Sequence, residues 1–503
     1  MVTDLERASP DGSLAVKGQA RPDGQGRDDD ANAGRAPKGG IDDEAERRLL
    51  RKLDRNLIPL VIGLFLFCFL DRINIGNARL YGLERDLGLR GDQFQVAVSI
   101  LFVTYILFEV PSNLVLKRFT PRRWISLIAL SWGAIATLSG FVGSYAGLLA
   151  CRLLLGAAEA GLFPGLTLYL TLFYTKRDFA LRMSYLTVGS PVAGALGGLL
   201  AWAIGHLDGY RGLSGWRWIL ILEGVPGMVL GVVAYALMPN DPASAKFLSP
   251  EEKALVETRL RRGYGHTASS AEMSREDVFR AFRDWKVWVF CVAHFCGITM
   301  LYGFSTFFPT IIRGLGRWGV AQVQLMTIPC YFLGAVVFIA VAFWSDRVQQ
   351  RGVFVVVFSA VSLVGYAILL SRSSPGVHYF GCFLVAGGLF SAVGLPLAWL
   401  TSNIPRYGKR AAASGMQITS GNVSGILAAF IYRTQDAPRY VRGHAVSLGM
   451  GGMAAVIYAC MTVWLLRENG RREAGVMKEK HRGLSEEELE ELGDDSPRYR
   501  YTT

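Results

Sequence analysis

Residues 57–77 read LIPLVIGLFLFCFLDRINIGN, an apolar run that carries Asp71 and Arg72 near its end. An α-helix rises about 1.5 Å per residue and needs about 20 apolar residues to cross the ~30 Å hydrocarbon core of a bilayer. The run has this length and therefore predicts a membrane-spanning helix. Ionisable side chains are costly inside lipid, so Asp71 and Arg72 are candidates for a functional site.

Similar apolar blocks follow along the whole chain. Of the 503 residues, 51% are hydrophobic and 19% are charged, fewer charges than the roughly 25% of a soluble domain. The blocks form two groups of six on either side of a polar stretch, a pattern typical of two parallel repeats. The sequence therefore predicts an all-α membrane protein with twelve transmembrane helices in two six-helix halves. After the first block, they cover residues 94–116, 124–142, 145–173, 183–204, 218–238, 287–311, 323–343, 353–370, 377–400, 411–432 and 446–466.

The domain organisation follows from the same composition. The N-terminal segment is rich in Gly, Asp, Ala and Arg and has too few bulky apolar residues to offset the entropy of folding, so we predict a disordered tail there. The predicted divisions are a cytoplasmic tail over 1–50, an N-terminal half over 51–238, a cytoplasmic loop over 239–286, a C-terminal half over 287–467 and a cytoplasmic tail over 468–503.

Two short helices are predicted outside the spans. Ser249, Pro250 and Glu252 offer a capping hydroxyl, a proline at the first helical position and a carboxylate three residues after the cap, which together predict a helix start in the central loop. Residues 484–492 predict a weak acidic helix in the C-terminal tail.

The distribution of basic residues predicts the orientation. Pairs at 47–48, 122–123, 409–410 and 471–472 fall on one side when the spans are threaded alternately, and basic residues near span ends favour the cytoplasmic side. We therefore expect both termini in the cytoplasm of a multi-pass protein, which we assign to the plasma membrane.

Composition argues against several other classes of function. The net charge of +12 could suggest nucleic-acid binding, but the Lys and Arg residues lie mostly between apolar blocks. The seven cysteines lie inside those blocks without a CxxC pair, as expected of small core residues. We predict no enzyme activity, no metal, no cofactor and no nucleic-acid partner.

Arg72 and Arg152 are the candidate anion-binding residues. Alternate threading places them in the same half of the membrane at similar depth. Two guanidinium groups facing one cavity repel each other unless an anion lies between them, and the planar guanidinium suits a carboxylate. The alternative is structural: Arg72 pairs with Asp71, and Arg152 with Glu159 or Glu223. We also assign Asn74, Tyr302 and Asn422 to the substrate site.

Glu159 is the leading candidate for proton coupling. It stands seven residues, or two helical turns, after Arg152, so the two side chains share one helix face. Burial favours the protonated form of a carboxyl and a nearby cation favours the charged form, so such a group responds to anion binding. Asp71 is assigned to the same role.

Other polar and small residues are assigned to gating or packing. Glu109 stands just before Pro111 and is predicted to be a gate or packing residue. Pro191 and Gly194 belong to a Gly/Pro stripe in the fifth predicted span, for which bending during gating and close helix packing are alternatives. His294 is interpreted as a packing histidine.

The chain resembles the major facilitator superfamily and, within it, the fungal anion:cation symporters, which include allantoate and nicotinate permeases. The resemblance implies proton-coupled uptake of a small organic anion by alternating access, with Arg72, Arg152 and Glu159 at charged positions. It extends from about residue 53 to 501 and rests on LDRINIGNA at 70–78, EVPSN at 109–113, RLLLGAAEAGLFPG at 152–165, GWRW at 215–218 with Glu223 and Gly224, KFL at 246–248, and residues 399–410. We also expect the protein to be a monomer.

The sequence departs from the superfamily pattern in one loop. The signature Gly-x-x-x-Asp-Arg-x-Gly-Arg-Arg is present only as KRFTPRR at 117–123, without its Asp, and a partial copy with Asp346 and Arg347 follows the eighth span. The resemblance therefore places the latch in the second half. The Gly/Pro stripe resembles one in exporters, so proton-antiport export of a metabolite or drug is an alternative, as is a non-transporting nutrient sensor.

Overall fold

The computed structural model describes residues 43–264, 275–475 and 492–503. Residues Arg48–Thr503 group as one compact unit. The predictions for the N-terminal tail and for a helix over 484–492 fall almost wholly outside the described residues. The domain divisions themselves remain a prediction.

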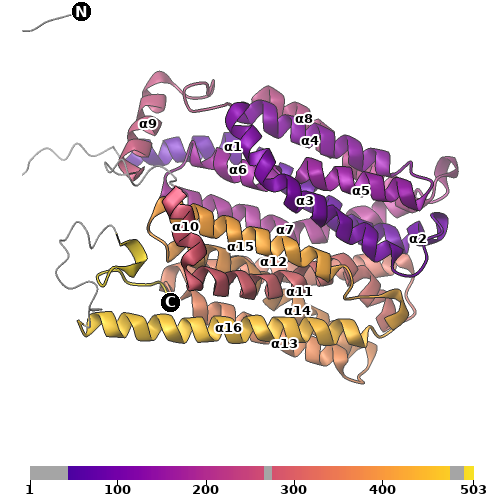
Figure 1. Cartoon of the computed structure of the whole chain (residues 1–503). Coiled ribbons are helices and arrows are strands. Elements are labelled where there is room, and N and C mark those ends of the chain that lie inside the picture. Colours follow the sequence, from indigo (N-terminus) through magenta and orange to yellow (C-terminus); the bar gives the residue numbers. More distant parts are fainter. Residues whose placement is uncertain (1–42, 265–274, 476–491) are drawn as a thin grey trace, which may run out of the picture. The chain divides into compact units, whose positions relative to one another are not determined.

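Long helices occupy the positions of all twelve predicted spans (Figure 1). In the N half they are α1 (Asp43–Leu80), α3 (Gln93–Arg118), α4 (Pro121–Ser139), α5 (Tyr145–Glu159) continued by α6 (Leu162–Thr171), α7 (Lys176–Gly205) and α8 (Gly215–Leu237). In the C half they are α11 (Trp285–Leu315), α12 (Val320–Val348), α13 (Arg351–Leu370), α14 (Pro375–Ser402), α15 (Tyr407–Ala428) and α16 (Val441–Glu473). Shorter elements are α2 (Leu83–Asp86), α9 (Pro250–Tyr264), α10 (Arg275–Arg283), η1 (Tyr210–Gly212), η3 (Thr434–Asp436) and η5 (Gly493–Asp495).

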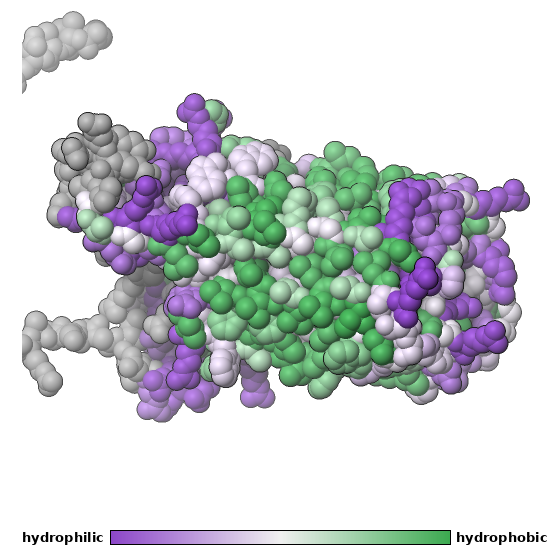
Figure 2. Space-filling view, turned by 90° about the horizontal axis from the view of Figure 1, so that it is seen from below, coloured by the Kyte–Doolittle hydropathy of each residue, from purple (hydrophilic) through white to green (hydrophobic). Residues whose placement is uncertain are grey.

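Among the described residues, ten helices are long and apolar enough to cross a membrane on their own composition. The two span positions outside this set are α4 and α15. Helix α4 packs along α8, and α15 packs against α11 and α3. Helix α15 is rich in Ala, Gly and Ser, small residues that let neighbouring helices approach closely. In Figure 2 an apolar band separates two polar ends, as expected of a bundle that spans a bilayer.

Different short helices and segments lie at the two ends of the bundle, which we call proximal and distal. The proximal end holds α9, α10 and residues 492–503, and the distal end holds α2 and residues 429–440 (Figure 1). The halves meet along α3 with α15 and along α7 with α12. A Cβ placed on Gly425 would lie 2.5 Å from the Phe102 ring, and one on Gly194 would lie 2.6 Å from Tyr331. Glycine is therefore needed at both seams.

The fourth predicted span is broken, contrary to the single helix expected from its apolar run. Helix α5 ends at Glu159 and α6 begins at Leu162. A Cβ on Gly161 would lie 1.8 Å from Ser112 Oγ, so the chain at the break touches α3. Pro164 follows in the first turn of α6, where its missing N–H costs least. The break places Glu159 at a helix end inside the bundle.

The helix start predicted in the central loop is confirmed. The Glu252 backbone N–H donates to Ser249 Oγ at 3.3 Å, and Glu252 Oε2 accepts from the Ser249 N–H at 2.8 Å. These two bonds form the reciprocal capping box at the start of α9. Lys52 Nζ lies 2.7 Å from the same carboxylate, which ties α9 to α1.

Candidate functional site

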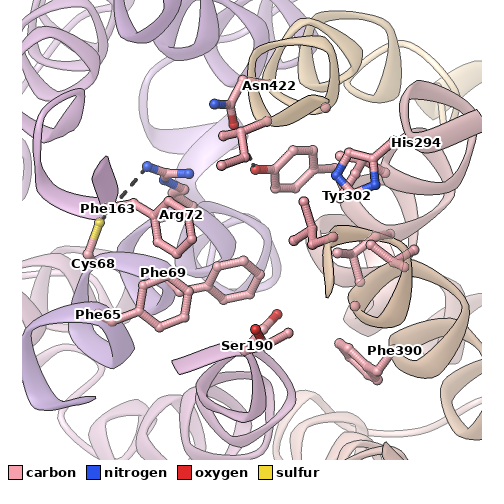
Figure 3. Close-up of a pocket in the computed structure, with 18 of the residues that line it drawn as sticks. Phe65, Cys68, Phe69, Arg72, Phe163, Ser190, His294, Tyr302, Phe390 and Asn422 are labelled. Atoms are coloured by element: carbon pink, nitrogen blue, oxygen red, sulfur yellow. Dashed lines mark hydrogen bonds between the residues drawn. The ribbon is translucent and has the colours of Figure 1, made fainter. Parts of the chain in front are cut away.

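A cavity of about 140 Å³ lies between the two halves (Figure 3). Its walls are mostly aromatic and aliphatic, with few polar groups, as is typical of small-molecule sites. The N half contributes Phe65, Cys68, Phe69, Arg72, Tyr105, Leu162, Phe163, Thr187 and Ser190, and the C half contributes His294, Ile298, Leu301, Tyr302, Phe390, Val393, Gly394, Leu397, Ile418, Gly421 and Asn422.

Arg72 is the cation of this lining. Its Nε donates to Glu159 Oε2 at 2.8 Å, and its guanidinium lies 4.4 Å from the centre of the Tyr105 ring. The prediction that Arg72 lines a cavity agrees with the geometry. The alternative pairing with Asp71 is wrong, because the ion-pair partner of Arg72 is Glu159.

Glu159 lies behind Arg72 and outside the lining. It is fully buried, and its second oxygen, Oε1, has no hydrogen-bond partner within the described chain. A buried carboxylate with one partner depends strongly on that partner, because an unpaired buried charge is costly. Arg72 is therefore the group that holds the charge of Glu159.

The expectation that Arg152 faces the same cavity as Arg72 is wrong. Arg152 is 3% exposed and is absent from the lining. Helix α5 packs against α3 and α4, so its polar face meets the interior of the N half. The depth estimate fixed how far along the helix Arg152 lies but not which neighbour it meets.

Asp71 and Asn74 also lie away from the cavity. Asp71 is 3% exposed, and its Oδ2 accepts a hydrogen bond from Trp132 Nε1 on α4. Asn74 is fully buried, and its Oδ1 accepts from Asn77 Nδ2 at 3.0 Å. Both side chains leave α1 on faces that pack against the N half, which corrects the expectation that Asn74 contacts substrate.

Tyr302 and Asn422 line the cavity from the C half, opposite Arg72 in Figure 3. Tyr302 OH donates to Asn422 Oδ1, and Asn422 Nδ2 donates to Glu109 Oε2, each at 3.5 Å. Glu109 on α3 is thereby joined to α15 across one seam between the halves. This position is compatible with the gating role predicted for Glu109.

His294, which the sequence indicated only as a packing histidine, lines the cavity. It is 3% exposed, and its Nδ1 has no hydrogen-bond partner within the described residues. No residue pattern in α11 distinguishes the cavity-facing side, because this helix is buried along most of its length.

Arg79 is a second residue that sequence reasoning did not single out. Its Nη2 donates to Thr434 Oγ1 at 2.7 Å and its Nε lies 3.0 Å from Glu84. Its guanidinium also lies 4.6 Å from the Phe94 ring centre. Arg79 thus ties the end of α1 to η3 of the other half at the distal end.

Asp346 and Arg347, which the sequence assigned to a latch, lie at the end of α12. Asp346 Oδ1 accepts from Arg351 Nη2 at 2.8 Å, and Arg347 is exposed. Arg351 also donates to the Ala398 carbonyl, which links α13 to α14.

The Gly/Pro stripe lies on α7, at the seam with α12. Gly194 packs on Tyr331, and a Cβ on Gly198 would lie 2.3 Å from Thr327 Oγ1. These contacts agree with the close-packing alternative for the stripe that also holds Pro191.

Comparisons with known proteins agree with this architecture. The sequence pattern that defines the Major Facilitator Superfamily matches residues 60–429 of this chain. An uncharacterized transporter of Schizosaccharomyces pombe is 42% identical over 441 residues, 87% of each chain. The MFS-type transporter cnsO of Penicillium expansum is 36% identical over 470 residues, 91% of this chain and 90% of that one.

A solved structure has the same fold. It is an inward-facing, unoccupied bacterial homologue of the human lysosomal transporter Spinster, with a TM-score of 0.63 and 14% identity, matched over 85% of this chain and 99% of that one. A twelve-helix bundle with a cavity between its halves is the architecture of a membrane transporter. The chain belongs to the major facilitator superfamily.

Proposed function

We propose that this protein imports a small organic anion, such as a carboxylate or a carboxylate vitamin, together with a proton. The observation that carries the proposal is that Arg72 meets the cavity and a buried carboxylate at the same time. Its guanidinium lines the cavity and at the same time binds the fully buried Glu159 at 2.8 Å. A substrate carboxylate in the cavity competes with Glu159 for this guanidinium.

The competition couples substrate to proton. When the substrate carboxylate binds Arg72, Glu159 loses the cation that balances its charge. An unpaired charge at a fully buried position is disfavoured, so Glu159 takes up a proton. The charges balance, because one anion and one proton enter a site that held one cation and one carboxylate. Neither is bound stably without the other, which is the condition for symport.

The remaining lining residues frame the substrate. Tyr302, Asn422 and His294 provide neutral hydrogen-bonding groups opposite Arg72. Phe65 and Phe163 provide apolar walls on the N-half side. Neutral polar groups around a single cation favour a monoanion with an apolar body.

Alternating access supplies the movement. Arg79 with Thr434 closes the distal end between the halves, whereas Glu109 with Asn422 joins them at the α3 and α15 seam. We propose that these contacts break and form in opposite phases, with Gly194 and Pro191 allowing α7 to move past α12. Asp346 and Arg351 belong to the latch of the C half.

We propose that both termini lie in the cytoplasm, on the distribution of basic residues near the span ends. We also propose that the protein is a monomer in the plasma membrane. The branch of the family is proposed to be the fungal anion:cation symporters, on the motifs around Arg72, Glu109 and Glu159.

Uptake of labelled nicotinate, allantoate, pantothenate and biotin tests the proposal. We expect one or more of them to accumulate in cells that express the protein, more at acidic than at neutral pH, and Arg72→Ala to abolish accumulation. Loss of preloaded substrate from the cells, in place of uptake, would indicate an exporter. Binding in proteoliposomes without flux would indicate a sensor.

A further inference from the structure

A second cluster of buried ionisable groups lies behind the cavity, inside the N half. It comprises Asp71 on α1, Arg152 on α5 and Glu223 on α8. All three residues are at most 3% exposed, and none lines the cavity. Asp71 and Glu223 each lie eight or nine residues from the distal ends of their helices, so they share a depth in the bundle.

Glu223 is the member of this cluster without a stabilising contact. Neither of its carboxyl oxygens has a hydrogen-bond partner within the described residues. Its charged neighbour is Asp71, a second carboxyl that repels a negative charge. A Cβ on Gly224 would lie 2.5 Å from the Thr137 backbone nitrogen, so α4 closes tightly over α8 beside it. A bare carboxylate is therefore not stable here.

The other charged residues of the helices around Glu223 lie nearer the helix ends. On α8 itself, Arg217 donates to the Gly140 carbonyl. On α4 the charged residues are Arg122 and Arg123, in its first turn at the proximal end. On α7 the charged residues stand in its first seven positions, also at the proximal end. Arg152 and Glu159 of α5 act on Asp71. Leaving aside Glu109, which bonds Asn422 at the seam, the two arginines Arg72 and Arg152 balance the three carboxyls Asp71, Glu159 and Glu223 when one of these carboxyls is neutral.

We propose that Asp71 and Glu223 share one proton in the resting protein and supply it to Glu159 when substrate takes Arg72. This inference rests on the proposed symport. Glu159 is fully buried and outside the lining, so a proton reaches it through protein groups. Asp71 is adjacent in sequence to Arg72, the partner of Glu159, and it accepts a hydrogen bond from Trp132. A Cβ on Gly227, one turn after Glu223 on α8, would lie 3.4 Å from the Trp132 ring, so Asp71 is the carboxyl placed to connect Glu159 with Glu223. The O–H bond on the Glu223–Asp71 pair breaks and an O–H bond forms on Glu159. The pair then takes up a new proton from water.

Glu223→Gln tests whether this pair supplies the proton, because glutamine keeps the shape and neutrality of a protonated glutamate but has no transferable proton. In proteoliposomes, we expect proton-driven accumulation of substrate to fall at least about tenfold, the size of a lost proton-transfer group. Exchange of labelled for unlabelled substrate in symmetric acidic buffer should stay within about twofold, since the loaded carrier need not release its proton. Glu468→Gln, on the C half, is the matched control and should keep both activities.

Two outcomes overturn the inference. One is a Glu223→Gln protein that accumulates substrate as the wild type does, which would mean that Glu159 takes its proton from the cavity. The other is an infrared spectrum in which Glu223→Gln removes no carbonyl band of a protonated carboxyl from the resting protein. A wild type without proton-driven accumulation would instead contradict the proposed function.

Discussion

The two halves of the bundle place their charges in different parts of the membrane. The N half holds acids and bases within its membrane spans, away from the two ends of the bundle: Asp71, Arg72, Glu109, Arg152, Glu159 and Glu223. The C half has Asp, Glu, Lys and Arg only near the ends of its described helices. There, Lys409 Nζ lies 2.6 Å from Asp284 and 2.7 Å from Asp494.

Polar and charged side chains of the C half have a structural role at the proximal end. Asn403 donates to and accepts from the Thr502 backbone, at 2.9 and 2.7 Å, and Asn469 does the same with Tyr501, at 2.9 Å in both directions. Arg472 donates to the carbonyls of Tyr499 and Asp494. These contacts fasten residues 493–503 to α14 and α16. We therefore propose that the N half carries the ion chemistry and that the C half frames the substrate.

Replacing one buried arginine in each half by alanine should give the largest difference in uptake. Arg72→Ala should lower uptake by at least about 30-fold, because removing one partner of a buried, hydrogen-bonded charge pair costs about 2–5 kcal/mol of binding free energy. Arg472→Ala, a buried arginine of the C half, should leave uptake per surface molecule within about twofold. Labelled uptake normalised to surface protein measures both. Equal losses in the two variants would remove the distinction between the halves.

Glycine substitutions test the packing that holds the ionic groups of the N half. A Cβ on Gly156 would lie 2.1 Å from the Leu101 carbonyl oxygen, so Gly156→Ala forces α5 away from α3. We expect a loss of about 1–3 kcal/mol in stability, as for other overpacked sites. Gly452→Ala on α16 is the control, because an added Cβ there meets nothing within 4 Å. Thermal unfolding in detergent should separate the two variants, and equal unfolding temperatures would contradict the tight contact.

His294 should matter less than Arg72, although both line the cavity. Its contribution is a neutral hydrogen bond, worth about 0.5–1.5 kcal/mol. His294→Gln should therefore raise the KM for uptake roughly 2- to 12-fold and leave the proton dependence intact. Uptake at several substrate concentrations measures this. A loss as large as that of Arg72→Ala would mean that the C half also carries essential binding chemistry.

The smallest effect on transport is expected at the proximal end of the C half. Burial raises the pKa of Asp494, but the ammonium groups of Lys286 and Lys409 outweigh it and hold the pKa below its ordinary value of 3.8. A depressed pKa stabilises the docked segment above pH 3.8, and this stability is lost as pH falls through the lower, folded-state value. Limited proteolysis should cut residues 493–503 only in strong acid in the wild type.

Asp494→Asn is the matching variant for that measurement. It should release the segment at neutral pH while changing uptake less than about twofold. If residues 493–503 remain protected from proteolysis in this variant, the hydrogen bonds of Asn403, Asn469 and Arg472 hold the segment without the Asp494 carboxylate.

Much of the fold could be predicted from the sequence, because spans in lipid need long apolar runs. The span positions, and the capping box at Ser249 and Glu252, depend only on neighbouring residues and were confirmed. The break at residues 160–161 was missed, since it arises from contact between Gly161 and Ser112 of another helix. Helices α4 and α15 fall outside the ten that could span on their own composition, and the spacing of the apolar blocks located them.

The candidate site was predicted less completely. Ionisable residues inside spans pointed to Arg72 and Glu159, and their ion pair joins helices 87 positions apart in sequence. Helix periodicity tells which residues share a face but not which neighbour that face meets. For that reason Arg152 and Asn74 were assigned to the cavity, while His294 and Arg79 were not recognised.

Proton uptake on substrate binding tests the exchange of partners at Arg72 most directly. Purified protein in weakly buffered solution receives a transported carboxylate while the pH and the bound substrate are measured together. The wild type should take up about one proton per bound anion, and Glu159→Gln should bind the anion without proton uptake. Binding by the wild type with no change in pH, or equal proton uptake by Glu159→Gln, would contradict the account.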